Sequence, residues 1–459
     1  MSAPTPQELA ERALELSRAD DCVVLVEASA HANLRWASNA LTTNGDTRSV
    51  DVTVISFLGA AGGSAAGSVS RQGQDMEGLV RASEQAAREA GPAEDAAPLV
   101  RGGVAADYTE APETTSGAAF AAFAPALGER MRAAAADGIE LFGYAEHEVD
   151  TLYLASSTGL RLRHAQPQAR IELTAKSHQR TRSTWVGAGG RSVEGVDLAQ
   201  MDADLRTRLD WQARRIAVDP GRHATILPPS ALADLMVYLF WSAGARDAFE
   251  GRTVFSRQGG GTRIGDTLSE RALRLFSDPH YPGLECEPFL AAAASGPASS
   301  VFDNGMPLGP VDWLHDGRLA ALLQSRHSAG LTGLPLTAPT SNLVLTDRAG
   351  SLDLEGLVAS TDRGLLLTCL WYIREVDPQT LLLTGLTRDG VYVVEGGEVV
   401  GATTNFRFND SPVGMLGRLS EVGATVPTIP REWADNFLRA AMPPVRVDDF
   451  NMSTVSQAS

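Results

Sequence analysis

Cysteine is scarce in this sequence. Its three thiols, Cys22, Cys286 and Cys369, lie far apart along the chain. An odd number of widely separated cysteines allows neither a disulfide framework nor a Cys-x-x-Cys metal clip. This usage fits a reducing compartment, so the sequence predicts a cytoplasmic protein without structural disulfides.

Long apolar runs are missing as well. The first twenty residues carry four acidic groups and lack the apolar core that a signal peptide needs. No stretch of 18 apolar residues follows anywhere in the chain. We therefore expect neither export nor a membrane span.

Positive charge is in short supply. Lys and Arg number 39 against 56 Asp and Glu, which gives a formal net charge of -17. Without a basic block the chain cannot neutralise a run of phosphates, so nucleic acid and anionic membranes are not expected partners. Instead, 44% apolar and 21% charged residues are typical of a protein that buries substantial cores, here in two or three domains.

The ligand pattern of a zinc peptidase is also absent. Such a site needs two or three ligands on rigid backbone and a carboxylate base, commonly as a pair of histidines on one helix with an adjacent Glu. No two of the eight histidines are separated by three, four or five residues. Glu146-His147-Glu148 cannot converge on one ion, because neighbours in a strand point to opposite faces.

Other catalytic motifs give no stronger signal. There is no Gly-x-Ser-x-Gly elbow, and Cys369 lies in the apolar run LLLTCLWY, where it is typical of a small core residue. The glycine-rich segment 257–261 lacks the Gly-Lys-Ser/Thr ending of a phosphate loop and indicates a surface turn. His280 lies in a proline-held turn and could line a cleft, but a structural turn is the simpler interpretation.

The first 92 residues predict a small α+β domain. Thr5 can cap a helix that has Pro6 at its first position and Glu8 in a capping box. The β-branched runs 22–27 and 50–58 predict buried strands, and the periodicity of 75–89 predicts a helix.

Residues 93–218 predict a second unit. It begins with a linker rich in proline and glycine and a helix over 118–136. Antiparallel strands follow as far as residue 177, and residues 208–216 are interpreted as part of another helix.

Residues 219–450 predict a largely antiparallel β domain with helices, followed by a tail over 451–459. Ser230 is the expected cap of a helix with a strong apolar face, and strand follows strand from Leu365 onward. Gly396-Gly397 predicts a two-residue hairpin, since glycine adopts the positive φ angles of such a loop at little cost. The expected fold class is therefore α+β.

Five segments, taken in order, resemble the TldD/PmbA family, over roughly residues 20 to 450. They are LRWASNALTTNGDTRSVDVTVISFLGAAGGSAAGSVS, YLASSTGLRLRHAQPQARIELTAKS, FEGRTVFSRQGGGTRIGDTLSERALRLFSDPHYPG, SRHSAGLTGLPLTAPTSNLVL and the long segment that runs from GLLLTCLWYIREVDP to MLGRLSEVG.

The resemblance points to a branch of the family without a zinc motif. In the catalytic branch, a His-Glu-x-x-x-His motif precedes the segment that resembles FEGRTVF, and a later Cys completes the zinc site. The corresponding positions here are about Met236, Val237 and Trp241. Residues 224–279 contain no His, and no Cys follows Cys369. Thioether, hydrocarbon and indole are poor or impossible substitutes for imidazole and carboxylate.

The resemblance therefore implies a PmbA/TldE-like subunit with no cofactor of its own. Its partner would be a TldD-like catalytic subunit that holds the zinc, and the heterodimer would cut unfolded peptides in a shared cavity. Within the fourth segment, Ser325, His327 and Asn342 are the candidates for substrate binding. Two alternatives stay open: a stand-alone peptide-binding or regulatory protein without proteolysis, and an unrecognised metal-independent hydrolase.

Overall fold

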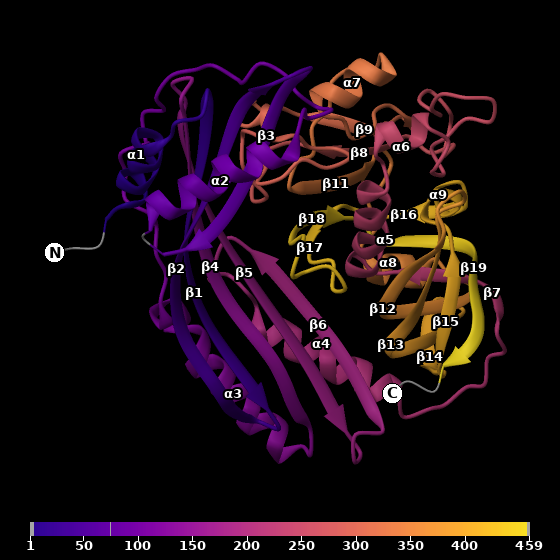
Figure 1. The fold of residues 1–459 in the computed structure, drawn as a ribbon. Helices are drawn as coiled ribbons and strands as arrows, with labels where there is room; N and C mark the ends of the chain where they lie inside the picture. Colours follow the sequence, from indigo (N-terminus) through magenta and orange to yellow (C-terminus); the bar gives the residue numbers. More distant parts are fainter. Residues whose placement is uncertain (1–3, 74, 457–459) are drawn as a thin grey trace.

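The N-terminal part of the molecule is one large antiparallel sheet. The computed structural model describes residues 4–73 and 75–456 and confirms the α+β class (Figure 1). The first sheet has the order β3-β2-β1-β4-β5-β6. Its strands are β1 (Asp21–Ala37), β2 (Ala40–Ala60), β3 (Gly63–Gln72), β4 (Glu140–Ser156), β5 (Arg161–Ser177) and β6 (Arg182–Gly190).

The boundary expected at 92/93 falls inside this sheet. Strand β1 pairs with β2 on one side and with β4 on the other, so strands from both predicted units share one ladder. The connection between β3 and β4 passes over the sheet through α2, the proline-rich segment and α3 (Figure 1). The segment whose composition is typical of a linker is thus part of a long connection within one sheet, and it does not separate two sheets.

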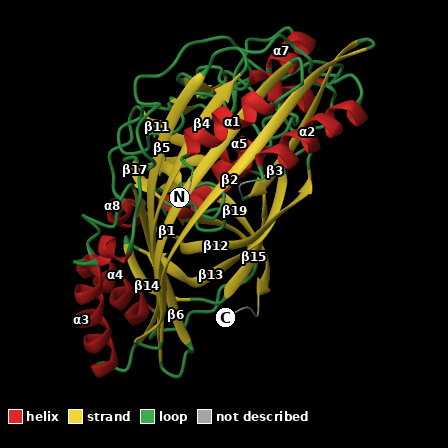
Figure 2. Ribbon diagram, turned by 60° about the vertical axis from the view of Figure 1, so that its left-hand side comes forward, coloured by secondary structure: helices red, strands yellow, loops and turns green. Residues whose placement is uncertain are grey.

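Helices cover one face of this N-terminal sheet (Figure 2). The even-numbered residues of β1 from Cys22 to Trp36 point to that face and pack with the helices, as the alternation of a strand requires. The helices are α1 (Pro6–Leu16), α2 (Met76–Ala90), the 3-10 turn η1 (Gly117–Phe120), α3 (Phe123–Ala136) and α4 (Leu198–Trp211). The opposite face is left for the C-terminal half, residues 220–456.

Two helix ends show what determines the boundaries of an element: a local cap at the start of α1 and a tertiary contact at the end of α4. The capping box of α1 is confirmed, with Thr5 Oγ1 accepting from the Glu8 backbone N–H at 3.2 Å. The helix expected over 208–216 instead ends at Trp211. The next residue, Gln212, exchanges two hydrogen bonds with the backbone of Ser183 on β6, which ties the chain to the sheet edge.

The C-terminal half contains a sheet that closes on itself. It has the order β12-β7-β19-β15-β13-β14, and β12 also pairs with β13, while β16 pairs with β19. Its strands are β7 (Gly221–Leu227), β12 (Arg363–Asp377), β13 (Leu382–Glu395), β14 (Glu398–Ala402), β15 (Asn405–Asp410), β16 (Leu419–Val422) and β19 (Val445–Ser456). The expected hairpin at Gly396-Gly397 is confirmed, with φ angles of 60° and 82°.

A third sheet lies above this closed sheet, with the order β10-β9-β8-β11-β18-β17. Its strands are β8 (Leu273–Ser277), β9 (Val311–His315), β10 (Arg318–Leu319), β11 (Asn342–Asp347), β17 (Val426–Thr428) and β18 (Arg439–Met442). Most pairs are antiparallel, as expected, whereas β7–β12 and β11–β18 are parallel. The remaining helices are α5 (Pro229–Trp241), α6 (Ala245–Phe249), η2 (Val301–Asp303), α7 (Arg326–Thr332), α8 (Leu354–Ala359) and α9 (Pro412–Leu416).

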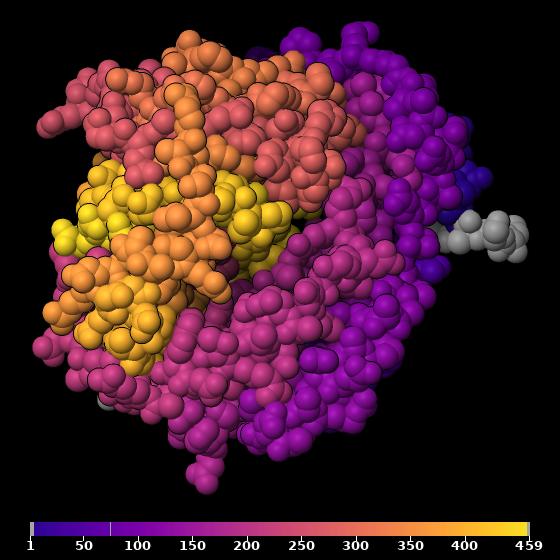
Figure 3. Space-filling model, turned by 180° about the vertical axis from the view of Figure 1, so that it is seen from behind, coloured from indigo at the N-terminus to yellow at the C-terminus, as the bar shows by residue number. Residues whose placement is uncertain are grey.

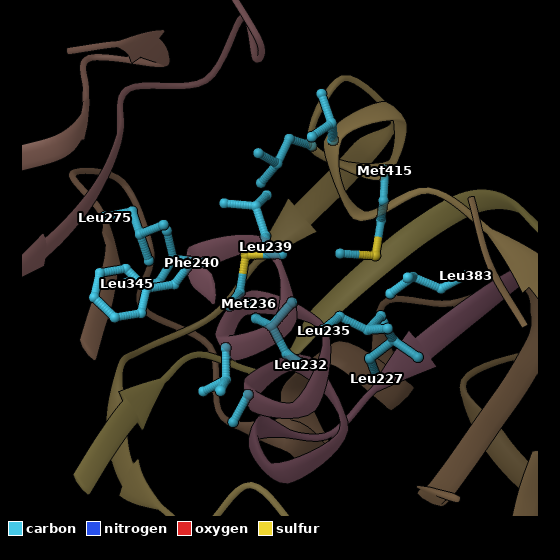
Figure 4. Packing of buried hydrophobic residues seen from close by; sticks show 14 of the residues in the cluster. Leu227, Leu232, Leu235, Met236, Leu239, Phe240, Leu275, Leu345, Leu383 and Met415 are labelled. Carbon is cyan, nitrogen blue, oxygen red and sulfur yellow. The ribbon is translucent and has the colours of Figure 1, made fainter. Parts of the chain in front are cut away.

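Helix α5 forms the centre of the C-terminal core. The expected cap at Ser230 is wrong: the N-cap is Pro228, which makes no side-chain cap, and Ser230 lies inside the helix. Proline at the first helical position fixes the starting φ angle, so a polar cap is not required. In Figure 4 the side chains of α5 meet those of the surrounding sheets on several sides, including Leu275, Leu345 and Leu383.

No helix formed by the described residues, 4–73 and 75–456, is both long and apolar enough to cross a membrane.

Candidate functional site

The positions that the resemblance assigns approximately to the zinc motif, Met236, Val237 and Trp241, lie on α5 and split into two environments. Met236 and Val237 are 0% exposed and belong to the C-terminal core, whereas Trp241 is 41% exposed at the end of the helix. Figure 4 shows Met236 among the leucines of the same helix. A thioether and a hydrocarbon packed in a core offer a zinc ion no suitable ligand and its water no base.

Elsewhere in the described part of the chain, no three His, Cys, Asp or Glu side chains gather in a way that could hold a metal ion. By their donor chemistry, Met236, Val237 and Trp241 do not fit the zinc centre that the resemblance assigns to the catalytic branch.

The three cysteines are poor nucleophiles in their surroundings. All are buried, and burial is the main cause that raises the pKa of the Cys22, Cys286 and Cys369 thiols to about 12. A thiol reacts through its thiolate, which is scarcely populated five units below the pKa. Thiol-based hydrolysis at neutral pH is accordingly disfavoured at each of these positions.

A cavity of about 790 Å³ lies between the N-terminal sheet and the C-terminal half. One side is the uncovered face of the sheet, with residues from β1, β2, β4 and β5. The other side comes from the end of α5, the segments 287–308 and 339–341, and the chain around β18. Seen from behind, the magenta strands and the yellow C-terminal segments meet along a recess (Figure 3).

Four carboxylates line this cavity, and we call them the acidic wall: Glu27, Asp51, Asp150 and Glu287. Glu27 on β1 is directly opposite Asp51 on β2, an arrangement of like charges that destabilises a sheet. The one guanidinium in the lining belongs to Arg439, and it is hydrogen-bonded to Gln168 Oε1 at 2.9 Å. The wall therefore carries an excess of negative charge.

The cavity strongly perturbs the Glu27 carboxyl group. Burial, followed by repulsion from Asp150, Asp51, Glu148 and Glu287, raises the pKa of Glu27 to about 7. Water reaches this side chain, yet protein surrounds it on most sides because it points into a hollow. At neutral pH the Glu27 carboxyl is therefore only partly ionised.

Asp150 shows the same tendency. Burial raises its pKa, although its Oδ1 accepts a hydrogen bond from Ser29 Oγ at 2.6 Å. Repulsion from Glu148 and Glu287 adds to the effect. Both carboxyls hold their protons more firmly than usual, first because burial disfavours the charged form and second because neighbouring carboxylates repel it.

The opposite side of the cavity is aromatic. Phe240 and Trp241 at the end of α5 pack on Phe437, with ring centroids 6.0 Å and 6.3 Å apart, and we call these three residues the aromatic wall. Beside it, Thr340 is only 4% exposed, and its hydroxyl has no hydrogen-bond partner among the described residues. The cavity thus combines an acidic side, an apolar side and a free hydroxyl.

The structure does not bring the three expected substrate-binding residues together around this cavity. Ser325 is the N-cap of α7 and accepts from the Ser328 backbone N–H at 3.2 Å. His327 lies on the same helix, with Nε2 3.9 Å from Glu94 Oε1. Asn342 is completely buried, and its amide bonds the backbone of Asp278 and Leu284. Their role in substrate binding stays a prediction.

Sequence reasoning overlooked the acidic wall, although part of the signal was present. Glu27 ends the buried run CVVLVE, and Asp51 lies within the β-branched run VDVTVISFL, so each acid interrupts a strand with an apolar character. Their meeting depends on the register of β1 with β2 and β4. The register of the β1–β2 hairpin was not predicted, and β4, which begins only at Glu140, pairs with β1 over a distance that no local pattern specifies.

Residues 220–454 match the family model described as the PmbA/TldA metallopeptidase C-terminal domain. This match covers half of the chain. The chain belongs to the TldD/PmbA family. No curated protein sequence matches it.

Solved structures show the same fold over the whole length of this TldD/PmbA family member. TldE from Thermococcus kodakarensis has a TM-score of 0.77 at 16% identity, with 97% of this chain and 99% of that chain covered. A putative modulator of a DNA gyrase from Thermotoga maritima has a TM-score of 0.77 at 15% identity and the same coverage. A putative modulator of DNA gyrase from Bacteroides thetaiotaomicron has a TM-score of 0.72 at 13% identity, with 97% of each chain covered.

Proposed function

We propose that this chain is the metal-free subunit of a heterodimeric TldD/TldE-type zinc metallopeptidase of the cytoplasm. A TldD-like partner supplies the zinc and cuts the peptide bond. This chain supplies part of the chamber and binds the unfolded peptide substrate.

The observation that carries the proposal is the chemistry of α5. The resemblance assigns the zinc motif of the catalytic branch to this helix, and the corresponding positions here are about Met236, Val237 and Trp241. Two of these side chains lie in the core, so a metal could reach them only by unpacking the helix. The chain thus has the fold of the family, while its α5 lacks the zinc ligands and the general base that peptide hydrolysis needs.

The cavity supports a role in substrate binding. Its volume of about 790 Å³ is within the range of small-molecule and peptide sites, and it lies beside the end of α5. The aromatic wall includes Trp241, the last of the three motif positions. The helix that carries the metal in the catalytic branch therefore borders the binding cavity in this chain.

Co-expression with a paralogue that carries His-Glu-x-x-x-His tests the proposal. We expect a stable complex with zinc in the paralogue only, because an obligate pair buries on the order of 2,000 Å² or more. An unstructured peptide should be cut by the complex and not by this chain alone. The measurements are the mass of the complex, zinc per chain and peptide cleavage followed by mass spectrometry.

The matched control replaces the Glu of the paralogue's motif with Gln, which should leave assembly intact and abolish cleavage. Stoichiometric zinc and cleavage by this chain in isolation would contradict the proposal. Peptide binding without any assembly would favour the stand-alone binding protein.

A further inference from the structure

The acidic wall carries four carboxylates against one nearby cation, Arg439, and none of the four is in an ion pair within the described chain. Glu27, Asp51, Asp150 and Glu287 form no ion pair with any other residue that the structure describes. Within residues 4–73 and 75–456, the side chain of Asp51 is bonded by Gln72 and that of Asp150 by Ser29, so neutral groups satisfy single oxygens without cancelling charge. Elsewhere in the same sheet, Glu146 is paired with Arg170 at 2.8 Å. Ion pairing is therefore available to acids of this sheet, but none of the four acids of the wall takes part in it within the described chain.

The free hydroxyl of Thr340 is a second, independent sign of a ligand. Buried polar groups in proteins almost always have a hydrogen-bond partner, and an exception calls for a missing one. Thr340 lies in the lining of this cavity and its Oγ1 is buried without a partner in the described chain. Because Thr340 borders the cavity, a polar group bound there is the candidate for this partner.

The shape of the site favours an extended chain over a single ion. The carboxylates do not form a cluster that could coordinate one metal within the described residues. The aromatic wall faces the same cavity and offers apolar surface. A peptide with a cationic group and a neighbouring apolar side chain matches both sides at once.

We propose that the acidic wall of this cavity binds a positively charged group of an extended peptide, either a Lys or Arg side chain or a free amino terminus. The aromatic wall holds an adjacent apolar side chain, and Thr340 bonds the peptide backbone. The peptide nature of the ligand rests on the proposed function, whereas the preference for positive charge rests on the cavity alone.

Binding of labelled peptides to the purified full-length chain tests this. One unstructured peptide carries an internal Arg and a Leu with an acetylated amino terminus. A second has Gln in place of Arg and a free amino terminus, and a third has Gln and an acetylated terminus. We expect the first or the second to bind about 10-fold tighter than the third in fluorescence anisotropy, and the advantage to shrink with added salt. Whichever binds tighter identifies the source of the charge.

Substitutions test whether the preference for a positively charged peptide arises from the acidic wall. Glu27→Gln should weaken binding of the charged peptide by about 3- to 10-fold and leave the neutral peptide unchanged. The matched control is Glu129→Gln, which removes one negative charge from the exposed surface of α3. It should leave both affinities unaltered.

A second variant examines the hydroxyl. Thr340→Val keeps the shape of the side chain and should weaken binding of all three peptides by about 3-fold. Thermal unfolding of each variant confirms that the fold is intact.

Two results would overturn the inference: equal affinities for all three peptides, or equal effects of Glu27→Gln and Glu129→Gln. Its failure is separable from failure of the proposed function, since assembly with a zinc-bearing partner is measured independently. If the chain assembles with its partner and the complex cuts peptides, but binding shows no preference for positive charge, only this inference is contradicted. If the chain binds charged peptides selectively but does not assemble with the partner, only the proposed heterodimer is contradicted.

Discussion

Glu27 connects the electrostatics of the cavity to the pH of the solution. Its pKa of about 7 means that the carboxyl loses its proton across the neutral range. A cation binds the ionised form, so affinity for a charged peptide should rise by roughly three- to tenfold from pH 6 to pH 8. Titrations over this range test it, with Glu27→Gln expected to flatten the profile. The other charged or titratable groups around the cavity are Asp51, Glu148, Asp150, His164, Glu287 and Arg439.

The same shift has a consequence for stability. The folded chain holds the Glu27 proton more tightly than the unfolded chain, whose carboxyl has the ordinary value of 4.5. This contribution is complete below about pH 4.5 and is lost as the pH rises to about 7. Glu27→Gln should therefore gain stability relative to the natural chain at pH 8 but not at pH 4.5. Urea unfolding at both values is the measurement, and a gain that is the same at both would contradict the assignment.

Restoring the motif residues on α5 should not restore a zinc site. Met236→His with Val237→Glu places polar groups at positions that are 0% exposed, which should cost about 3–5 kcal/mol of the free energy of unfolding. Trp241→His is the control, because this position is 41% exposed and should cost about 1 kcal/mol. Urea unfolding and metal analysis are the readouts. A stable triple variant with one zinc would show that the packing around α5 still accommodates a metal.

At the level of single residues, the missing zinc ligands could be predicted from the sequence, whereas the carboxylates of the cavity could not. The poor ligands at Met236, Val237 and Trp241 follow from residue chemistry once the resemblance provides the positions. The carboxylates of the cavity do not, because Glu27 and Asp51 acquire their meaning only when β1 and β2 pair.

At the level of elements, the Gly396-Gly397 hairpin offers a test with a built-in control. A Cβ on Gly397 would lie 2.6 Å from the carbonyl oxygen of Ala359, whereas one on Gly396 would meet open space. Both residues have positive φ, so Gly396→Ala should cost about 1 kcal/mol and Gly397→Ala about 1–3 kcal/mol more. The comparison of the two midpoints in urea checks it, and equal costs would mean that the contact with Ala359 relaxes.

Elements with strong local signals were predicted well. The capping box at Thr5 and the glycine hairpin are decided by neighbours in the sequence and appear where expected. The cap at Ser230 and the helix over 208–216 were wrong, since Pro229 and the bonds of Gln212 to β6 compete with the local pattern. Propensity gives way where a tertiary partner is available.

At the level of the whole molecule, Arg431 joins the two halves. It bonds Asp389 on β13 at 2.9 Å and stacks between Trp371 on β12 and Trp185 on β6 of the N-terminal sheet. Arg431→Met should cost about 3–5 kcal/mol, because it removes the nearer of the two cations beside the buried Asp389 carboxylate and leaves only the longer contact with Arg388, at 3.8 Å, among the described residues.

The double variant Arg431→Met with Asp389→Asn should recover part of this loss, since no uncompensated charge remains. Urea unfolding of the two variants and the natural chain provides the comparison. A double variant that is no more stable than the single one would assign the loss to the aromatic stacking instead.

The arrangement of the sheets was the least predictable level. The sequence indicates many strands after Leu365, but it does not indicate that β7, which begins at Gly221, pairs with both β12 and β19. It also places a boundary at 92/93, inside a sheet that is continuous. Long-range pairing is set by the burial of whole faces, and composition alone does not report it.

The position of β19 in the closed sheet has a consequence for biosynthesis. This strand pairs with β7 and β15, yet it emerges from the ribosome roughly 220 residues after β7, an interval of about 10–45 s at typical elongation rates. During that time the edge of β7 that pairs with β19 has no permanent neighbour, although β12 can already cover the other edge. Nascent chains should therefore depend on chaperones that shield strand edges until β19 has been made, and termination before residue 445 should yield aggregates rather than a smaller folded product.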